Sequence, residues 1–104
     1  MIKVTIELWL SMGEELGEDF RSLSHMRSVL EATVKEGTTV GKLFGQLADR
    51  YPPIGEKVFD RKTQRFCGDV VVTFNERVIS PSDVYGRILQ RGDKITVLPV
   101  YAGG

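Results

Sequence analysis

Residues 28–51 read SVLEATVKEGTTVGKLFGQLADRY, and this stretch decides the fold class because its hydrophobic period changes partway along. Over residues 28–36 apolar and polar side chains alternate, which predicts a β-strand that ends at Gly37. From residue 40 onward the apolar side chains recur at the spacing of one helical face, which predicts a helix over residues 40–51. That face consists of Val40, Leu43, Phe44, Leu47, Ala48 and Tyr51. A strand joined to a helix in this way predicts an α+β domain.

Both ends of the predicted helix carry boundary signals. The hydroxyl of Thr38 or Thr39 can accept a hydrogen bond from the first helical turn, so one of them is expected to be the N-cap. Pro52 disfavours helical geometry at the residue before it, so the helix is expected to end by Tyr51.

On the N-terminal side, residues 2–10 alternate strictly and predict a first strand, paired antiparallel with residues 28–36. Its odd-numbered positions, Trp9 among them, lie on the face away from the helix. Residues 11–27 combine glycines, serines and charges without periodicity, so we expect a long exposed connection there rather than a packed element.

On the C-terminal side, residues 69–79 predict a hairpin that turns at Asn75 and Glu76, and residues 94–100 predict a last strand. Residues 80–90 fit a single capped helical turn, whereas residues 54–68 carry conflicting signals and yield no assignment. The expected architecture is a mixed sheet of four to five strands with one main helix on one face, in a single domain over residues 1–104.

Bulk composition excludes several classes of partner. The 104 residues include fourteen basic and fourteen acidic side chains, so neither nucleic acid nor an anionic membrane is an expected ligand. No apolar run reaches the length of a membrane span, and the opening strand pattern does not resemble a signal peptide. The one cysteine cannot form an internal disulfide, and together these features favour a cytoplasmic protein.

After Val100, the end of the sequence decreases in side-chain size from Tyr101 through Ala102 to Gly103 and Gly104. Two glycines make a thin, flexible C-terminal tail that fits a narrow tunnel in a partner protein, and they leave the carboxylate of Gly104 unhindered. A carboxylate is a poor electrophile, so a partner must activate it. Attack on the phosphorus of ATP would give an acyl-adenylate, and a sulfur nucleophile would then displace AMP to leave a thiocarboxylate.

Elsewhere the chain lacks the motifs of an enzyme. We find no Ser/His/Asp set, no Cys/His spacing typical of a metal site, and no phosphate-binding loop. The expectation is therefore a carrier protein and not an enzyme, with no metal and no bound cofactor, whose partner consumes the ATP.

Two stretches resemble the MoaD/ThiS family of ubiquitin-like sulfur carriers: residues 87–104, RILQRGDKITVLPVYAGG, and residues 38–52, TTVGKLFGQLADRYP. The resemblance implies a β-grasp fold and carries the functional role of the family's final glycines onto Gly103 and Gly104. It also implies adenylation by an E1-like enzyme, sulfur from a sulfurtransferase or cysteine desulfurase, and an acceptor such as the large subunit of molybdopterin synthase, in molybdenum cofactor or related biosynthesis. Long segments at 11–27 and 52–68, and Leu98 where many relatives have proline, depart from the family pattern.

A partner-binding surface is expected beside the tail. Alternation places three apolar side chains on the sheet face that the helix leaves uncovered, where they form a docking site if they are contiguous and ordinary exposed residues if they are scattered. These are Trp9, Val71 and Leu98, and we expect the segment of Pro99, Val100, Tyr101 and Ala102 to continue the same surface.

Alternatives remain open at this stage. Cys67 is either a persulfide relay or a small apolar filler. The chain could act as the small subunit of molybdopterin synthase, or as a ubiquitin-like modifier that forms isopeptide bonds through Gly104. In another class, it is a non-catalytic β-grasp binding module whose tail has no role.

Overall fold

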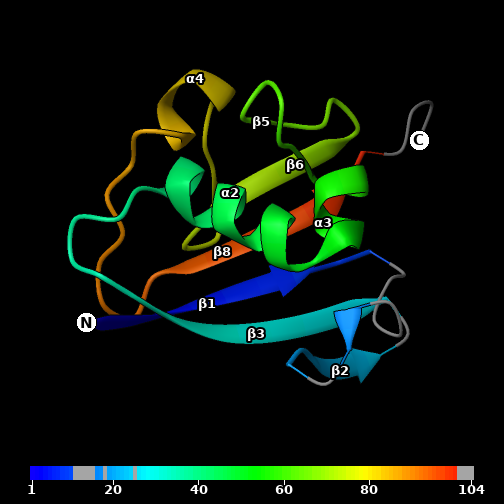
Figure 1. Cartoon of the computed structure of the whole chain (residues 1–104), viewed down its shortest axis with the longest axis horizontal. Coiled ribbons are helices and arrows are strands. Elements are labelled where there is room, and N and C mark those ends of the chain that lie inside the picture. Colours follow the sequence, from blue (N-terminus) through cyan, green and yellow to red (C-terminus); the bar gives the residue numbers. More distant parts are fainter. Residues whose placement is uncertain (11–15, 18, 25, 101–104) are drawn as a thin grey trace.

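The computed structural model describes residues 1–10, 16–17, 19–24 and 26–100 of the chain. The strands of the main sheet are β1 (Ile2–Leu8), β2 (Arg21–Ser24), β3 (Arg27–Val34), β6 (Val70–Phe74), β7 (Arg77–Val78) and β8 (Lys94–Pro99). The other elements are the helices α2 (Val40–Arg50), α3 (Pro52–Lys57) and α4 (Pro81–Val84) and the short strands β4 (Phe59–Asp60) and β5 (Arg65–Phe66). Figure 1 shows α2 lying across one face of the main sheet.

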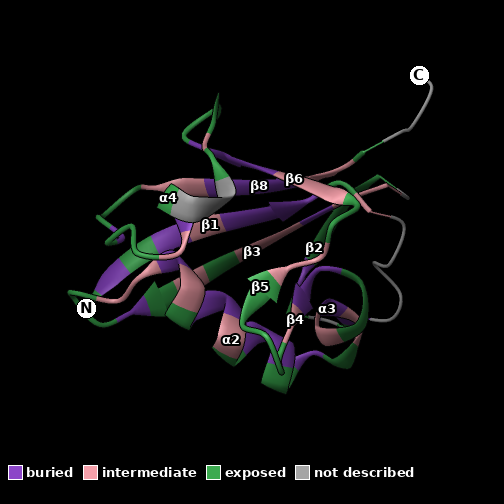
Figure 2. Cartoon of the chain, turned by 90° about the horizontal axis from the view of Figure 1, so that it is seen from above, coloured by how far each residue is buried: buried purple, intermediate pink, exposed green. Residues whose placement is uncertain are grey.

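The main sheet has six strands in the order β2-β3-β1-β8-β6-β7. Strand β1 is central: it pairs antiparallel with β3, as predicted, and parallel with β8, which in turn pairs antiparallel with β6. The side chains of β1 that face α2 are buried, and they are Ile2, Val4, Ile6 and Leu8. The predicted α+β arrangement, a mixed sheet with one main helix on one face, is confirmed (Figure 2).

Helix α2 begins and ends where its boundary signals indicate. The Thr39 hydroxyl accepts a hydrogen bond from the backbone N–H of Lys42 at 3.2 Å, so Thr39 is the N-cap. The chain leaves helical geometry at Tyr51, immediately before Pro52, with φ −120° and ψ 99°. The apolar face of α2 packs on the sheet and supplies much of the core.

The expectation of an exposed, unpacked connection over residues 11–27 is wrong for much of that segment. Leu16 and Phe20 are buried in the core, and β2 adds a sixth strand beside β3. The Phe20 ring packs edge-on against Tyr51, with 5.1 Å between ring centroids. Burial of this kind depends on tertiary contacts and produces no local period, so alternation could not reveal it. Residues 11–15, 18 and 25 lie outside the described part of the chain.

The unassigned stretch 54–68 forms α3 and the β4–β5 hairpin, and an aromatic cluster holds it to the domain. Phe66 contacts Phe44, Phe59 and Tyr85, with ring-centroid distances of 4.9, 5.3 and 5.7 Å. The backbone N–H of Phe66 also donates to the Tyr85 hydroxyl at 2.9 Å. This cluster joins α2, the hairpin and the turn after α4 into one core.

The second hairpin and the late helical turn match the prediction. Asn75 and Glu76 have φ values of 51° and 70°, which is the left-handed geometry of a two-residue turn between β6 and β7. Helix α4 is the single turn expected within residues 80–90, and its Val84 is buried. The last strand ends at Pro99, one residue earlier than predicted.

We predict that Phe59→Ala will lower the free energy of unfolding by about 3–5 kcal/mol, because Phe59 is fully buried and its removal leaves a cavity among aromatic rings. Chemical denaturation followed by circular dichroism measures this change. Val78→Ala is the control, since Val78 is 74% exposed and its truncation should cost no more than about 0.5 kcal/mol. Equal effects of the two substitutions would contradict the assignment of Phe59 to the core.

Candidate functional site: the open sheet face and the root of the tail

The structure brings the three predicted face residues into one row, which we call the apolar row: Trp9, Leu98 and Val71. Val71 lies directly opposite Leu98 in the β6–β8 pairing. Trp9 follows β1, and its backbone N–H donates to the carbonyl oxygen of Val97 at 2.8 Å, which sets Trp9 beside Leu98. Trp9 is 37% exposed, whereas Leu98 and Val71 are half-buried. The row crosses the sheet on the face opposite α2.

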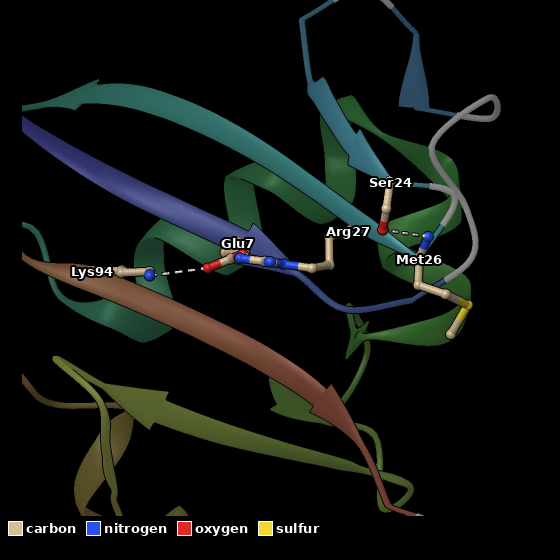
Figure 3. A network of polar contacts seen from close by, with 5 residues as sticks. All are labelled: Glu7, Ser24, Met26, Arg27 and Lys94. Carbon is tan, nitrogen blue, oxygen red and sulfur yellow. Dashed lines mark hydrogen bonds and ion pairs between the residues drawn. The ribbon is translucent and has the colours of Figure 1, made fainter.

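Beside the apolar row lies a buried carboxylate that the sequence analysis did not identify as a site residue. The side chain of Glu7 is only 3% exposed although it lies on the uncovered face of β1. Its Oε1 atom accepts a hydrogen bond from Arg27 Nε at 2.8 Å and a second from Arg27 Nη2, and its Oε2 atom lies 3.0 Å from Lys94 Nζ. Figure 3 shows Glu7 held between these two cations, which come from β3 and β8.

These contacts determine the charge state of Glu7. Burial alone opposes ionisation of the carboxyl group, but the hydrogen bonds from Arg27 and Lys94, with their positive charges, outweigh it and hold the pKa of Glu7 below its ordinary value. Glu7 is therefore ionised at neutral pH. The three groups together carry a net positive charge on the uncovered face.

The network also orients Arg27 against the apolar row. The guanidinium carbon of Arg27 lies 4.4 Å from the centroid of the Trp9 ring, within the range of a cation–π contact. The turn that precedes Arg27 is held by the Ser24 hydroxyl, which accepts from the backbone N–H of Met26 at 3.2 Å (Figure 3). Glu7 thus fixes the cation that supports Trp9. The signal in the sequence was a carboxylate near the end of β1, on the same alternating face as Trp9.

The root of the tail lies at the end of β8, next to the apolar row. Pro99 pairs with Val70, and the backbone N–H of Val100 donates to the carbonyl oxygen of Asp69 at 2.9 Å. The Val100 side chain is 47% exposed. The remaining predicted site residues, Tyr101, Ala102, Gly103 and Gly104, lie outside the described residues.

Cys67 lies at the end of β5 and is half-buried. Burial raises the pKa of its thiol, and the charges of Asp69 and Asp60 raise it further. Its backbone N–H donates to the carbonyl oxygen of Val58 at 2.8 Å. The thiol lines an apolar cavity of about 270 Å³ formed with residues such as Val70 and Tyr85. This environment favours the neutral thiol over the nucleophilic thiolate.

Within the described ranges, no group of three or more His, Cys, Asp or Glu side chains is placed to hold a metal ion. None of the helices that the structure describes is long and apolar enough to cross a membrane.

We predict that Glu7→Gln will lower the free energy of unfolding at neutral pH by about 1.5–3 kcal/mol, because charge-assisted hydrogen bonds are lost. Since the folded-state pKa is depressed, the contribution of ionised Glu7 is present above the unfolded pKa and disappears as the pH falls through the folded value. Denaturant titrations at neutral pH and at about pH 3 should therefore show the difference from the wild type shrinking in acid.

The matched control is Glu31→Gln on the neighbouring strand. The Glu31 side chain is 63% exposed and lies 3.8 Å from Lys3 Nζ, so its loss should cost less than about 1 kcal/mol at either pH. A Glu7 variant with the same pH-independent, small effect would contradict the network.

Comparison with known structures supports the fold. Small archaeal modifier protein 1 of Haloferax volcanii matches with a TM-score of 0.69 at 17% identity, over 97% of this chain and 100% of that chain. The putative molybdopterin converting factor, subunit 1, of Pyrococcus furiosus matches with a TM-score of 0.66 at 22% identity, over 97% and 100%. A chain of the Amycolatopsis orientalis BexX/CysO complex matches with a TM-score of 0.64 at 20% identity, over 97% and 99%.

These likenesses show that the chain has the β-grasp, ubiquitin-like fold. No curated protein sequence matches the chain significantly. The model of the ThiS family, however, matches residues 19–104, which include α2, the strands β3, β6 and β8 and the tail. The chain therefore belongs to the ThiS family of small, ubiquitin-like sulfur carrier proteins.

Proposed function

We propose that this protein carries sulfur as a thiocarboxylate on Gly104, in the biosynthesis of molybdopterin or a related cofactor. The observation that carries the proposal is the position of the tail root. The Val100–Asp69 hydrogen bond anchors the chain where β8 ends, directly beside the apolar row. Because Val100 is fixed to the sheet, a partner that docks on the uncovered face would meet the start of the tail that carries Gly103 and Gly104 at a constant distance from its binding surface.

The chemistry proceeds in the active site of the partner. A carboxylate oxygen of Gly104 attacks the α-phosphorus of ATP, and pyrophosphate leaves to give an acyl-adenylate. Hydrosulfide then attacks the acyl carbon, forming a C–S bond as the C–O bond to AMP breaks. AMP leaves with the electron pair, and the carrier ends in a thiocarboxylate. The carrier itself contributes no acid, base or bound cofactor to these steps.

The uncovered face acts as the recognition surface in this proposal. Trp9 offers a large apolar contact, and the contact with Arg27 limits its freedom before binding. Leu98 and Val71 extend that contact toward the root of the tail. Preorganised aromatic and Arg side chains of this kind commonly dominate the binding energy of protein interfaces.

The partners follow from the reaction. An E1-like adenylating enzyme binds ATP and receives the tail in its tunnel. A sulfurtransferase or cysteine desulfurase holds the sulfur as a persulfide, and a thiol reductant releases it as hydrosulfide while being oxidised to a disulfide. An acceptor such as the large subunit of molybdopterin synthase then takes the sulfur from the thiocarboxylate. The carrier is a co-substrate in the cytoplasm and not an enzyme. No nucleic acid or membrane takes part.

We predict that incubation with ATP, the adenylating enzyme and sulfide will exchange one oxygen for sulfur in the last peptide, as measured by intact and peptide mass spectrometry. A variant that lacks Gly104 should show no exchange, because its C-terminal carboxylate belongs to Gly103 and ends one residue short of the reacting position in the active site. Exchange in the truncated chain, or none in the full chain, would contradict the proposal. A branched peptide joined through Gly104 would identify a protein modifier instead.

We also predict that Trp9→Ala will weaken binding to the adenylating enzyme roughly thirtyfold, the loss typical of an aromatic interface residue. Isothermal titration calorimetry measures the dissociation constant, and circular dichroism checks the fold. Ile88→Ala is the control, because Ile88 is 57% exposed but lies outside the apolar row. If the two variants bound equally well, the uncovered face would not be the docking surface.

A further inference from the structure

A second surface with binding features lies along the outer edge of β3, away from the tail root. Strand β2 pairs only with Val29, Ser28 and Arg27. Among the described residues, no strand lies beside positions 30–34 on that side (Figure 1). An unpaired strand edge exposes backbone donors and acceptors that can pair with another chain.

The direction of the β1 hydrogen bonds determines which backbone groups face β3. The N–H of Thr5 donates to the carbonyl of Asp93 at 2.9 Å, and the N–H of Trp9 donates to the carbonyl of Val97 at 2.8 Å. The backbone groups of both residues therefore point toward β8. Because the direction of the backbone N–H and C=O groups alternates along a strand, those of Ile6 and the other even-numbered residues of β1 point toward β3.

The same alternation identifies the free groups of β3. Ile6 lies opposite Leu30, so the backbone groups of Leu30 point toward β1 and are used in the sheet. Those of Glu31 and Thr33 point to the opposite side, toward the unpaired edge. The edge therefore offers the N–H and C=O groups of two residues at the spacing that an added strand requires.

A groove runs along this edge between β3 and α2. One cavity, of about 480 Å³, is lined on its apolar side by Leu30, Ala32, Leu43 and Leu47. A second, of about 370 Å³, continues it toward the start of α2, and the two share Thr33, Val34 and Gln46 among their lining residues. An added strand would direct alternate side chains into this groove.

The two ends of the groove differ in charge. At the end near the start of α2 lie Lys35 and Lys42, and neither makes an ion pair within the part of the chain that is described. Glu36 offsets one of these charges. At the other end, Asp19 accepts a hydrogen bond from the Tyr51 hydroxyl at 2.7 Å and pairs with Arg50 at 3.4 Å.

We propose that an extended segment of a partner protein adds to β3 as an antiparallel strand. Its backbone pairs with Glu31 and Thr33, its alternate apolar side chains fill the groove under α2, and its acidic N-terminal end meets Lys35 and Lys42. Strand addition of this kind obtains affinity from the backbone and specificity from the groove. The site is separate from the uncovered face, so both could be occupied at once.

Charge favours a partner segment over a second copy of this chain. Two carboxylates close to the edge already have cationic neighbours: Asp19 pairs with Arg50, and Glu31 lies 3.8 Å from Lys3 Nζ. The third, Glu36, lies at the same end of the groove as Lys35 and Lys42. An antiparallel second copy would therefore place its own Glu36 at the opposite end and bring no free carboxylate from its edge to Lys35 and Lys42. An acidic peptide supplies one.

The test uses the full chain and the synthetic peptide acetyl-Asp-Asp-Val-Thr-Val-Thr-Val-amide, with a scrambled peptide of the same composition as the control. In ¹H–¹⁵N NMR titrations, the first peptide should shift the amides of Glu31 and Thr33 and slow their hydrogen exchange. The scrambled peptide should leave them unchanged. Absence of saturable shifts at millimolar peptide would overturn the proposal.

Two variants separate the backbone from the charge contribution. Thr33→Pro removes an outward N–H without removing a bond to β1 and should abolish binding. Should its circular dichroism spectrum show unfolding, the double variant Lys35→Glu, Lys42→Glu decides: it should weaken binding about fivefold or more. Lys62→Glu, on the distant β4–β5 hairpin, should have no effect. Equal binding by the double variant and the wild type would overturn the assigned direction of the strand.

The alternative that a second copy of this chain occupies the β3 edge is tested on the protein without peptide. Light scattering after size-exclusion chromatography should give a monomer. A dimer that dissociates on Thr33→Pro would show that the edge is covered by another copy and would overturn the proposal.

Discussion

The parallel pairing of β1 with β8 is the constraint on which the rest of the structure depends. It joins the two ends of the sequence at the centre of the sheet, with Leu8 opposite Val97. That register sets Trp9 beside Leu98 and delivers the root of the tail next to both. A slip of one residue would turn the apolar row into the core and expose the core to solvent, so burial beneath α2 holds the register in place.

The uncovered face shows how a small sheet can expose apolar side chains while remaining specific. Glu7 is ionised although buried, because Arg27 and Lys94 together outweigh the cost of removing its charge from water. The resulting network holds Arg27 over Trp9. In the proposed function this face binds the adenylating enzyme, while the groove beside β3 remains available to a second protein, which would let one carrier be recruited and activated at the same time.

Several elements were predictable because their signals are local. The alternation of residues 28–36 and the helical spacing after Val40 gave the correct strand and helix, and the Asn75–Glu76 turn gave the correct hairpin. The segment before β3 was not predictable: Leu16 and Phe20 enter the core through contacts with distant residues such as Tyr51, which leave no period in the sequence. The same holds for Phe66 in the stretch that resisted assignment.

The sequence by itself determined the α+β class, the family resemblance and the chemistry expected of Gly103 and Gly104, because period, chain order and side-chain size are properties of the chain alone. It also placed Trp9, Val71 and Leu98 on the uncovered face, since alternation assigns a side to each strand residue. Only the tertiary structure decided that these three form one row, that Glu7 lies between Arg27 and Lys94, and that β3 has a free edge. The reason is that strand order and register are set by pairing between residues far apart in the sequence, which no local pattern encodes.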